Sequence, residues 1–291
     1  MRIVVPVQPG GGLDPQARLL GRKFHDSMGQ PVVIENRPGA NGMLGTEYVA
    51  KSSADGHTLL CAAASLASAV TLYKNLSFDV QRDLAPVSQL SSNPQFLIAH
   101  PSLPVNSLRE FIVLAKIQAG KLNAASGGTG TANHLVLEMF KQRAGFQATH
   151  IPYKGSGPAT IALISGEVDF SFAGAISKIP HMRSGKVKAL AVTTPQPSRL
   201  APALPALASL YPGFESVNWY AIFAPAATPA AVINKLGMEI IAALKSPEIR
   251  DFMLKEGADA AGSTPPEFAA YFKNEVERYA KVIRTANIRV E

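Results

Sequence analysis

The sequence is short of cysteine, of aromatic residues and of long apolar runs. Its 291 residues include one cysteine, Cys61, so no disulfide can form within the chain. This residue lies in the apolar run TLLCAAAS, where a buried structural thiol is expected. Aromatic residues make up 7% and do not alternate with the basic residues, which disfavours a nucleic-acid-binding protein. No apolar run approaches the roughly 18 residues that a membrane-spanning helix requires.

Charge is also sparse. Charged residues make up 17% and hydrophobic residues 47%, which excludes a disordered chain and provides for a large core. The net charge of +7 comes from basic residues spread singly along the chain. Such a mild positive field favours small anions, but it is equally expected of a basic surface without a partner. No signal peptide precedes the first strand pattern, so an export signal was either never present or has been removed.

Short β-branched runs alternate with segments of helical length. This alternation predicts an α/β fold with mainly parallel sheets. The length suits one large or two medium domains. The predicted strands are Ile3–Val7, Val32–Asn36, Thr58–Ala63, Phe96–Ala99, Leu122–Ala125, Thr149–Pro152, Val168–Phe172, Lys188–Thr193 and Tyr220–Ala224.

The ends of several helices carry clear signals. Asp14 is a predicted N-cap, with Pro15 at the first helical position and Gly29 as the stop. Thr264 and Glu267 form a predicted capping box for the last helix. The apolar face of that helix comprises Phe268, Phe272, Tyr279 and Val282.

Two proline-marked stretches, 99–107 and 222–230, each follow a predicted strand. If the chain leaves one domain at the first and returns at the second, residues 101–221 form an inserted domain. Residues 1–100 and 222–291 then make up the other domain. Ordinary loops would also place prolines here, so the bounds are an expectation.

Each of the two predicted lobes contains a strand, a glycine-rich loop and a helix start. The first lobe has Gly10, Gly11 and Gly12, and the second has GGTGT at 127–131. Glycine allows a backbone to approach a ligand closely, and a helix start offers free N–H groups and a positive dipole end. Each loop is therefore a candidate anion site, although either alone could be only a turn. Asp14 is either a plain cap or a cap that also orders the first loop, and we favour the second.

The sequence lacks three common enzyme motifs. The third glycine of a dinucleotide fingerprint would be Pro15 or Asn133, and neither a P-loop nor a nucleophile elbow occurs. An enzyme would have to use Ser126, His134 and Asp169, which no spacing connects. We interpret His134 as a capping or packing residue of a first helical turn rather than a metal ligand. Asp169 is interpreted as a structural turn residue or as a contact for a ligand amine.

The motifs and their order resemble the Bug family of extracytoplasmic solute receptors, the binding proteins of tripartite tricarboxylate transporters. The resemblance covers nearly the whole chain. The matching segments are VVPVQPGGGLDPQAR, VVIENRPGANGMLG, ADGHTLL, LNAASGGTGTANHL, HIPYKGSGPA, GEVDFSF, GKVKALAVT, FAPAATPAAVINKL and TPPEFAAYFKNE. The chain departs from the family pattern at Ala54, at His57 and in the segment 199–214, and these departures leave the glycine loops intact.

This resemblance implies a two-lobed periplasmic-binding-protein fold of type II, located in the periplasm, that closes on a small ligand, commonly a carboxylate. In such proteins backbone N–H groups, hydroxyls and ordered waters hold the carboxylate. Carried over residue by residue, the implied ligand-binding residues are Gly10, Gly11, Gly12, Asp14 and Ser65 in the first lobe, and Ser126, Gly127, Thr129, Gly130, Thr131, Tyr153, Gly155, Ala173 and Gly174 in the second.

The resemblance therefore leads us to expect a receptor without catalytic activity, cofactor or metal. It would capture a small carboxylate by clamshell closure and present it to a tripartite transporter. The expected partners are membrane transporter subunits or a sensor protein, with no nucleic acid, no membrane insertion and a monomeric chain. The alternative is a small α/β hydrolase or transferase acting on carboxylate substrates. Dicarboxylates, amino acids and aromatic acids would all suit two anion sites.

Overall fold

The computed structural model describes residues 1–10, 12–174, 179–255 and 257–290, which form two compact units. The first unit comprises Met1–Ser92 and Trp219–Ala280, and the second comprises Asn93–Asn218 and Lys281–Glu291. The division falls inside two long strands, because each of these strands pairs in one unit along part of its length and continues into the other unit. The bounds indicated by the sequence, at 100/101 and 221/222, lie eight and three residues further along the chain than the divisions at 92/93 and 218/219.

The first unit contains a mixed sheet. Its strand order is β2-β1-β3-β9-β4, and β10 pairs with β4. β1 is parallel to β2 and β3, as helical connections between strands require, whereas β9 is antiparallel to β3 and β10 is antiparallel to β4. The strands are β1 (Arg2–Val5), β2 (Val33–Asn36), β3 (Thr58–Ala63), β4 (Leu84–Ala99), β9 (Val217–Pro225) and β10 (Asp259–Ala260).

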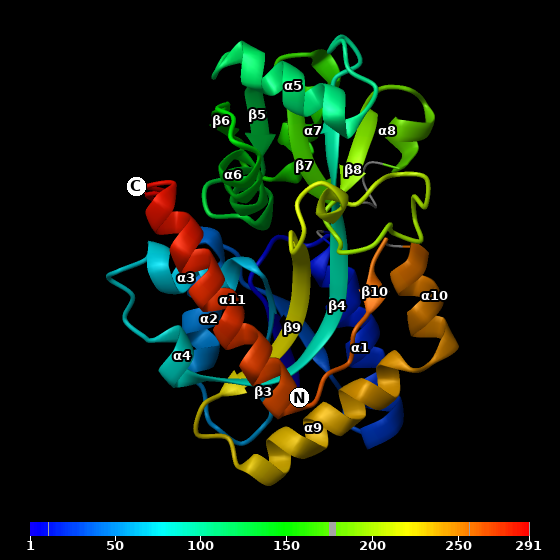
Figure 1. The fold of residues 1–291 in the computed structure, drawn as a ribbon. Helices are drawn as coiled ribbons and strands as arrows, with labels where there is room; N and C mark the ends of the chain where they lie inside the picture. Colours follow the sequence, from blue (N-terminus) through cyan, green and yellow to red (C-terminus); the bar gives the residue numbers. More distant parts are fainter. Residues whose placement is uncertain (11, 175–178, 256, 291) are drawn as a thin grey trace. The chain divides into compact units, whose positions relative to one another are not determined.

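Helices cover both faces of this sheet, and β9 shows why. Its side chains alternate between the two faces of the sheet. Ile222 packs in a core with helices α1, α9 and α10. Phe223 faces the other way, and its ring centroid lies 5.3 Å from that of Phe268 and 5.1 Å from that of Phe272, both on α11. Figure 1 shows α1 and α11 on opposite sides of β9. The helices of this unit are α1 (Leu13–Met28), η1 (Ala40–Gly42), α2 (Met43–Ala50), α3 (Ser65–Leu72), α4 (Val80–Asp83), α9 (Ala230–Leu244), α10 (Pro247–Lys255) and α11 (Pro265–Thr285), whose last turn belongs to the second unit.

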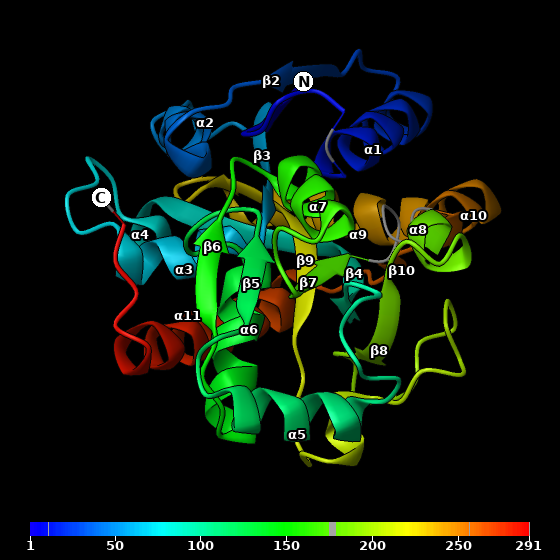
Figure 2. The same ribbon diagram turned by 90° about the horizontal axis from the view of Figure 1, so that it is seen from above.

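The second unit has a mixed sheet of order β8-β4-β7-β5-β6. β5 is parallel to β6 and β7, and β4 is antiparallel to β7 and β8. An aromatic cluster around Phe111 and Phe140 packs α5 and α6 against one face, and α7 covers the other, as Figure 2 shows. The elements are α5 (Leu108–Gln118), β5 (Asn123–Ser126), α6 (Ala132–Ala144), β6 (Thr149–Pro152), α7 (Ser156–Ser165), β7 (Phe170–Gly174), α8 (Ile179–Arg183), β8 (Lys188–Val192) and η2 (Leu207–Ser209).

The last helix begins as the sequence predicts. Thr264 donates its backbone N–H to Glu267 Oε2 at 2.8 Å, and Phe268 N–H bonds the Thr264 carbonyl oxygen at 2.9 Å. The predicted apolar face of α11 is buried. None of the helices in the described part of the chain is long and apolar enough to cross a membrane.

Candidate functional site

The first glycine loop follows β1 and leads directly into α1. The helix begins at Leu13 and its cap is Gly12, whose φ of −57° and ψ of −23° are already helical. The prediction of Asp14 as the N-cap is therefore wrong: Asp14 lies in the first turn. Its carboxylate turns back toward the loop, because the backbone N–H of Gly10 bonds it there at 3.1 Å.

Asp14, whose side chain is buried, is the centre of a partly buried hydrogen-bond network. Its Oδ2 accepts from Arg18 Nε at 3.0 Å, and its Oδ1 accepts from Asn36 Nδ2 at 3.0 Å. Asn36 also donates to the Val7 carbonyl oxygen at 3.1 Å, which connects the end of β2 to the loop. Burial raises the pKa of Asp14, but the bonds from Arg18, Asn36 and Gly10 together bring it below its ordinary value. Asp14 thus orders the loop, and it occupies the Gly10 N–H that an anionic ligand would otherwise use.

Other donors of the first loop stay available. Within the described residues, the backbone N–H groups of Gly12, Leu13 and Asp14 make no hydrogen bond. They stand at the start of a sixteen-residue helix, where the dipole favours negative charge. Gly11, which the sequence also assigns to the site, lies outside the described residues.

Two further side chains belong to this end of the sheet. Ser65 is the first residue of α3, which follows β3, and β3 runs parallel to β1, so both loops lie at the carboxyl edge. Tyr220 is opposite Ala63 in the β3–β9 register. Its hydroxyl oxygen lies 2.9 Å from the place where a Cβ on Gly12 would be. Sequence reasoning missed Tyr220 as a site residue, because the strand pattern alone does not show which loop a strand residue approaches.

The second glycine loop is held in shape by its own side chains. Gly128 and Gly130 have φ angles of +135° and +78°, which only glycine adopts readily. Ser126 Oγ accepts the Gly128 N–H at 3.1 Å, and Thr131 Oγ1 donates to the Gly128 carbonyl oxygen at 2.7 Å. The hydroxyls of Ser126 and Thr131 therefore shape the loop.

At the start of α6, three backbone donors remain. The N–H groups of Thr129, Ala132 and Asn133 have no hydrogen-bond partner among the described residues. Asn133 itself connects the helix start to the sheet, because its Nδ2 donates to the Phe172 carbonyl oxygen at 2.7 Å and to Gln95 Oε1 at 3.0 Å. This role of Asn133 was not predicted.

The segment after β6 packs directly against the second loop. Gly155 N–H bonds the Gly127 carbonyl oxygen at 3.1 Å, and a Cβ on Gly127 would lie 3.2 Å from Ser156 N. Gly127 is thus required for close packing between two loops. The Tyr153 hydroxyl donates to Glu167 Oε1 at 2.6 Å, and burial together with this bond raises the pKa of Tyr153 to about 12.

The remaining predicted site residues, Ala173 and Gly174, end β7. They pair with Phe96 and Gln95 of β4. Ala173 is buried and Gly174 is half-buried. Residues 175–178, which come next in the chain, are not among those described.

Two histidines lie beneath the second loop. His134 Nδ1 accepts the Gly130 N–H at 3.1 Å, so His134 caps the helix start as interpreted from the sequence. The His150 ring stacks on it with centroids 3.6 Å apart and planes 9° apart, and His150 Nε2 lies 2.6 Å from Ser126 Oγ. The described residues include no group of three or more metal-ligating side chains. His150 was missed as a site residue, because it comes from a different strand.

The catalytic trio considered from the sequence does not form. Ser126 Oγ meets His150 and not His134. Asp169 Oδ2 accepts the Asn123 backbone N–H at 2.7 Å, and the Asp169 N–H bonds the Asn123 carbonyl oxygen at 2.9 Å. Asp169 therefore joins β5 to the start of β7, which agrees with its interpretation as a structural residue.

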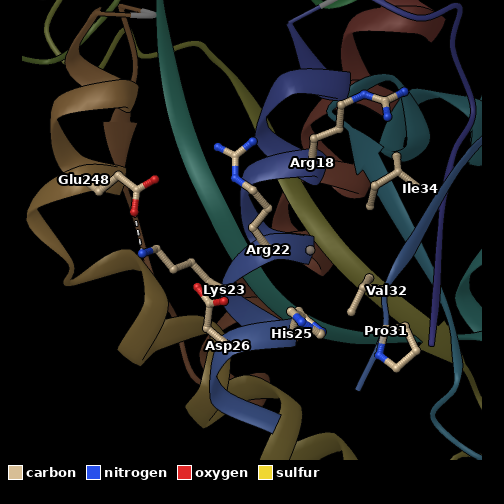
Figure 3. Close-up of a pocket in the computed structure, with 10 residues that line it drawn as sticks. Arg18, Arg22, Lys23, His25, Asp26, Pro31, Val32, Ile34 and Glu248 are labelled. Atoms are coloured by element: carbon tan, nitrogen blue, oxygen red, sulfur yellow. Dashed lines mark ion pairs between the residues drawn. The ribbon is translucent and has the colours of Figure 1, made fainter. Parts of the chain in front are cut away.

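A pocket of about 700 Å³ lies between α1, β2 and α10 (Figure 3). Lys23 and Glu248, which line it, form an ion pair. Arg18 also lines it and pairs with Asp14. Arg22 lines the pocket without such a partner among the described residues, but Gly12 and Leu13, whose N–H groups are available, do not line it. We therefore do not assign the anion site to this pocket.

Comparisons with known proteins agree with this geometry. A model of the tripartite tricarboxylate transporter family receptors matches residues 16–288. The BugT protein of Bordetella pertussis is 37% identical over 294 residues, covering 100% of this chain and 90% of BugT. A Rhodopseudomonas palustris structure, Rpa4515 with adipate, is 31% identical with a TM-score of 0.89, covering 99% and 97% of the two chains. MatC of the same organism, with bound malate, is 30% identical with a TM-score of 0.83, covering 97% and 98%. The α/β fold of a solved periplasmic binding protein, 32% identical with a TM-score of 0.85, is likewise shared.

Proposed function

Because this chain belongs to the tripartite tricarboxylate transporter family of receptors, we propose that it binds a small dicarboxylate and presents it to a membrane transporter. The observation that carries the proposal is the pair of helix starts, one in each unit. Each follows the carboxyl end of a strand and keeps backbone N–H groups without a partner among the described residues. A carboxylate satisfies several such donors at once, and charge-assisted hydrogen bonds are stronger than neutral ones.

The class of ligand follows from having two such loops. The loop before α1 and the loop before α6 each offer donors for one carboxylate, which favours a ligand with two carboxylates. Adipate and malate, found in two related structures, are molecules of this kind. We propose that this chain binds a dicarboxylate of similar size, and that the predicted site residues act mainly through their backbone.

We further propose that binding is not followed by chemistry. Ser126 Oγ is engaged by Gly128 and His150, and the carboxylate of Asp169 is engaged by Asn123. The proposed receptor works in the periplasm as a monomer, and its partner is the membrane part of a tripartite transporter. A sensor protein is the other candidate partner, and co-purification with membranes would distinguish the two.

The experiment is titration calorimetry with adipate, malate and a neutral diamide of adipic acid. Two glycine variants test the loops: Gly10→Ala in the first and Gly130→Ala in the second. Both positions have positive φ, +85° and +78°, so an added Cβ strains the loop. We expect each variant to reduce dicarboxylate affinity by at least tenfold, and the diamide not to bind.

The chain provides matched controls. Gly29 and Gly145 stand at the opposite ends of the same two helices with similar φ angles, +66° and +70°, and a Cβ on either would meet nothing within 4 Å. Their alanine variants carry the same backbone strain away from the loops, and should bind normally. Equal losses of dicarboxylate affinity in the loop and control variants would mean that backbone strain alone reduces binding. If the wild-type protein binds the diamide as tightly as adipate, the carboxylate proposal is refuted.

A further inference from the structure

His134, which is buried, and His150, which is half-buried, form a stacked pair directly beneath the second glycine loop. Each ring holds a different part of that loop: His134 Nδ1 accepts the Gly130 N–H at 3.1 Å, and His150 Nε2 lies 2.6 Å from Ser126 Oγ. Ser126 Oγ in turn accepts the Gly128 N–H at 3.1 Å. The two imidazoles, which come from α6 and β6, therefore set the orientation of two glycines of the loop, Gly128 and Gly130.

The contact of His134 with the loop requires its ring to be neutral. A protonated imidazole carries hydrogen on both nitrogens, so His134 Nδ1 could no longer accept from Gly130. Two charged rings with centroids 3.6 Å apart would also repel each other. Burial, and then the nearby His150 and Lys141, lowers the pKa of His134 to about 3; burial, and then Lys141, lowers the pKa of His150 to about 4. At neutral pH the pair therefore keeps the loop-holding form.

The surroundings of the pair contain few other charges. On α6, Glu138 Oε1 lies 3.8 Å from His134 Nε2, but it is already paired with Lys141 Nζ at 2.8 Å. β5 and β6, which carry Ser126 and His150, contain no other titratable side chain. Burial therefore disfavours a proton on the pair first, and the charge of Lys141 nearby disfavours it further.

We propose that His134 and His150 are positioning residues of the ligand site, which hold the second loop in its binding conformation and release it when they are protonated. This inference rests on the proposed function, because it concerns the loop that would bind one carboxylate. It goes beyond that proposal by assigning a ligand-binding role to two side chains that need not touch the ligand, and by giving the site its own response to acid.

The first test separates the acceptor from the ring. His134→Leu removes the acceptor for the Gly130 N–H, whereas His134→Asn places an amide oxygen near the former Nδ1 position. We expect adipate affinity at pH 7 to fall about tenfold in the leucine variant, the size of one lost hydrogen bond, and to be largely retained in the asparagine variant. His25→Asn, an exposed histidine of the first unit, is the matched control. Equal adipate affinity in wild type, His134→Leu and His134→Asn would overturn the positioning role.

The second test uses pH. In the double variant His134→Asn with His150→Gln, neither position can be protonated, while both can still hydrogen-bond. Adipate itself takes up protons in acid, which weakens its binding to every variant. The informative quantity is therefore the difference in adipate affinity between wild type and the double variant at each pH. Between pH 7 and pH 4, we expect wild-type affinity to fall by about twofold more than that of the double variant, because about half of the His150 rings, with a pKa of about 4, are protonated at pH 4. Identical profiles would refute the acid response.

A third measurement does not depend on the ligand. Amide hydrogen exchange of Gly130, followed by NMR, should be faster in His134→Leu than in wild type and His134→Asn, because the bond to Nδ1 is lost. Failure of wild type to bind any dicarboxylate would count against the proposed function alone. Unchanged Gly130 exchange in a folded leucine variant would count against the role of the histidines alone.

Discussion

Replacing Gly12 by alanine tests how closely the first loop approaches β9. Gly12 has ordinary helical backbone angles, φ −57° and ψ −23°, so alanine introduces no backbone strain. The added Cβ would lie 2.9 Å from the Tyr220 hydroxyl oxygen, and the next atoms of that ring are 3.8 Å away. The clash is thus with one atom, and removing this atom should remove the clash.

The magnitude follows from these distances. A contact below 3.0 Å requires the Tyr220 hydroxyl or the first turn of α1 to move, and overpacking of this kind costs about 1–3 kcal/mol. We expect Gly12→Ala to lower the free energy of unfolding by about 1.5 kcal/mol, near the middle of that range. In a Tyr220→Phe background the nearest atom is an ordinary contact, so the same change should cost only about 0.5 kcal/mol, the residual preference for glycine over alanine at a cap.

The assay is a double-mutant cycle by urea denaturation of the four proteins. A coupling of about 1 kcal/mol between the two sites is expected. Additivity within about 0.3 kcal/mol would refute the argument, since it would mean that Gly12 and Tyr220 do not meet. Dicarboxylate affinity, measured on the same four proteins, gives a second result. If the backbone of Gly12 approaches the ligand, binding should stay weak in the double variant even though its stability is restored.

Three other predictions concern polar groups that are buried or half-buried. Asn36→Leu should weaken dicarboxylate binding at least fivefold in calorimetry, because Asp14 and the loop carbonyl of Val7 lose a shared donor. Glu275→Gln should lower the free energy of unfolding by about 3 kcal/mol in urea, because it leaves the half-buried Arg278 cation without its carboxylate. Burial lowers the pKa of His150 from 6.5 to about 4 in the folded state, so the unfolded chain takes up the proton first as the pH falls. The free energy of unfolding should therefore fall by up to about 3 kcal/mol from pH 6.5 to 4. In His150→Gln, the free energy of unfolding should fall less steeply over the same pH range.

Much of the architecture could be predicted because local signals agreed with one another. Strands at 58–63 and 149–152 match the structure at both ends, and the capping box places the last helix correctly. The long strand β4 was predicted only from Phe96 onward, since its first part contains Pro86, Pro94 and several serines. Proline within a strand normally argues against one, but the pairing with β10 and other strands compensates.

The candidate site was predictable where its chemistry is carried by the backbone. Glycine-rich turns before helices can be recognised from the sequence alone, so both loops were predicted. The residues that shape them were harder to find: Asn36, Tyr220 and His150 come from other strands, and only the fold brings them to the loops. The role of Asp14 was half right, because its sequence position shows a helix start but not the direction of its carboxylate.

The only tryptophan of the chain stands at the point where β9 passes from one unit to the other. Trp219 is fully buried among the aromatic rings of α11, and its indole N–H donates to Glu275 Oε2 at 3.1 Å. Indole emission responds to nearby charge, so any change in the path of β9 at this residue would alter the fluorescence colour and intensity. The chain thus contains a single-site optical reporter at the crossing strand, which allows conformational change on ligand addition to be timed by stopped flow without attaching a label.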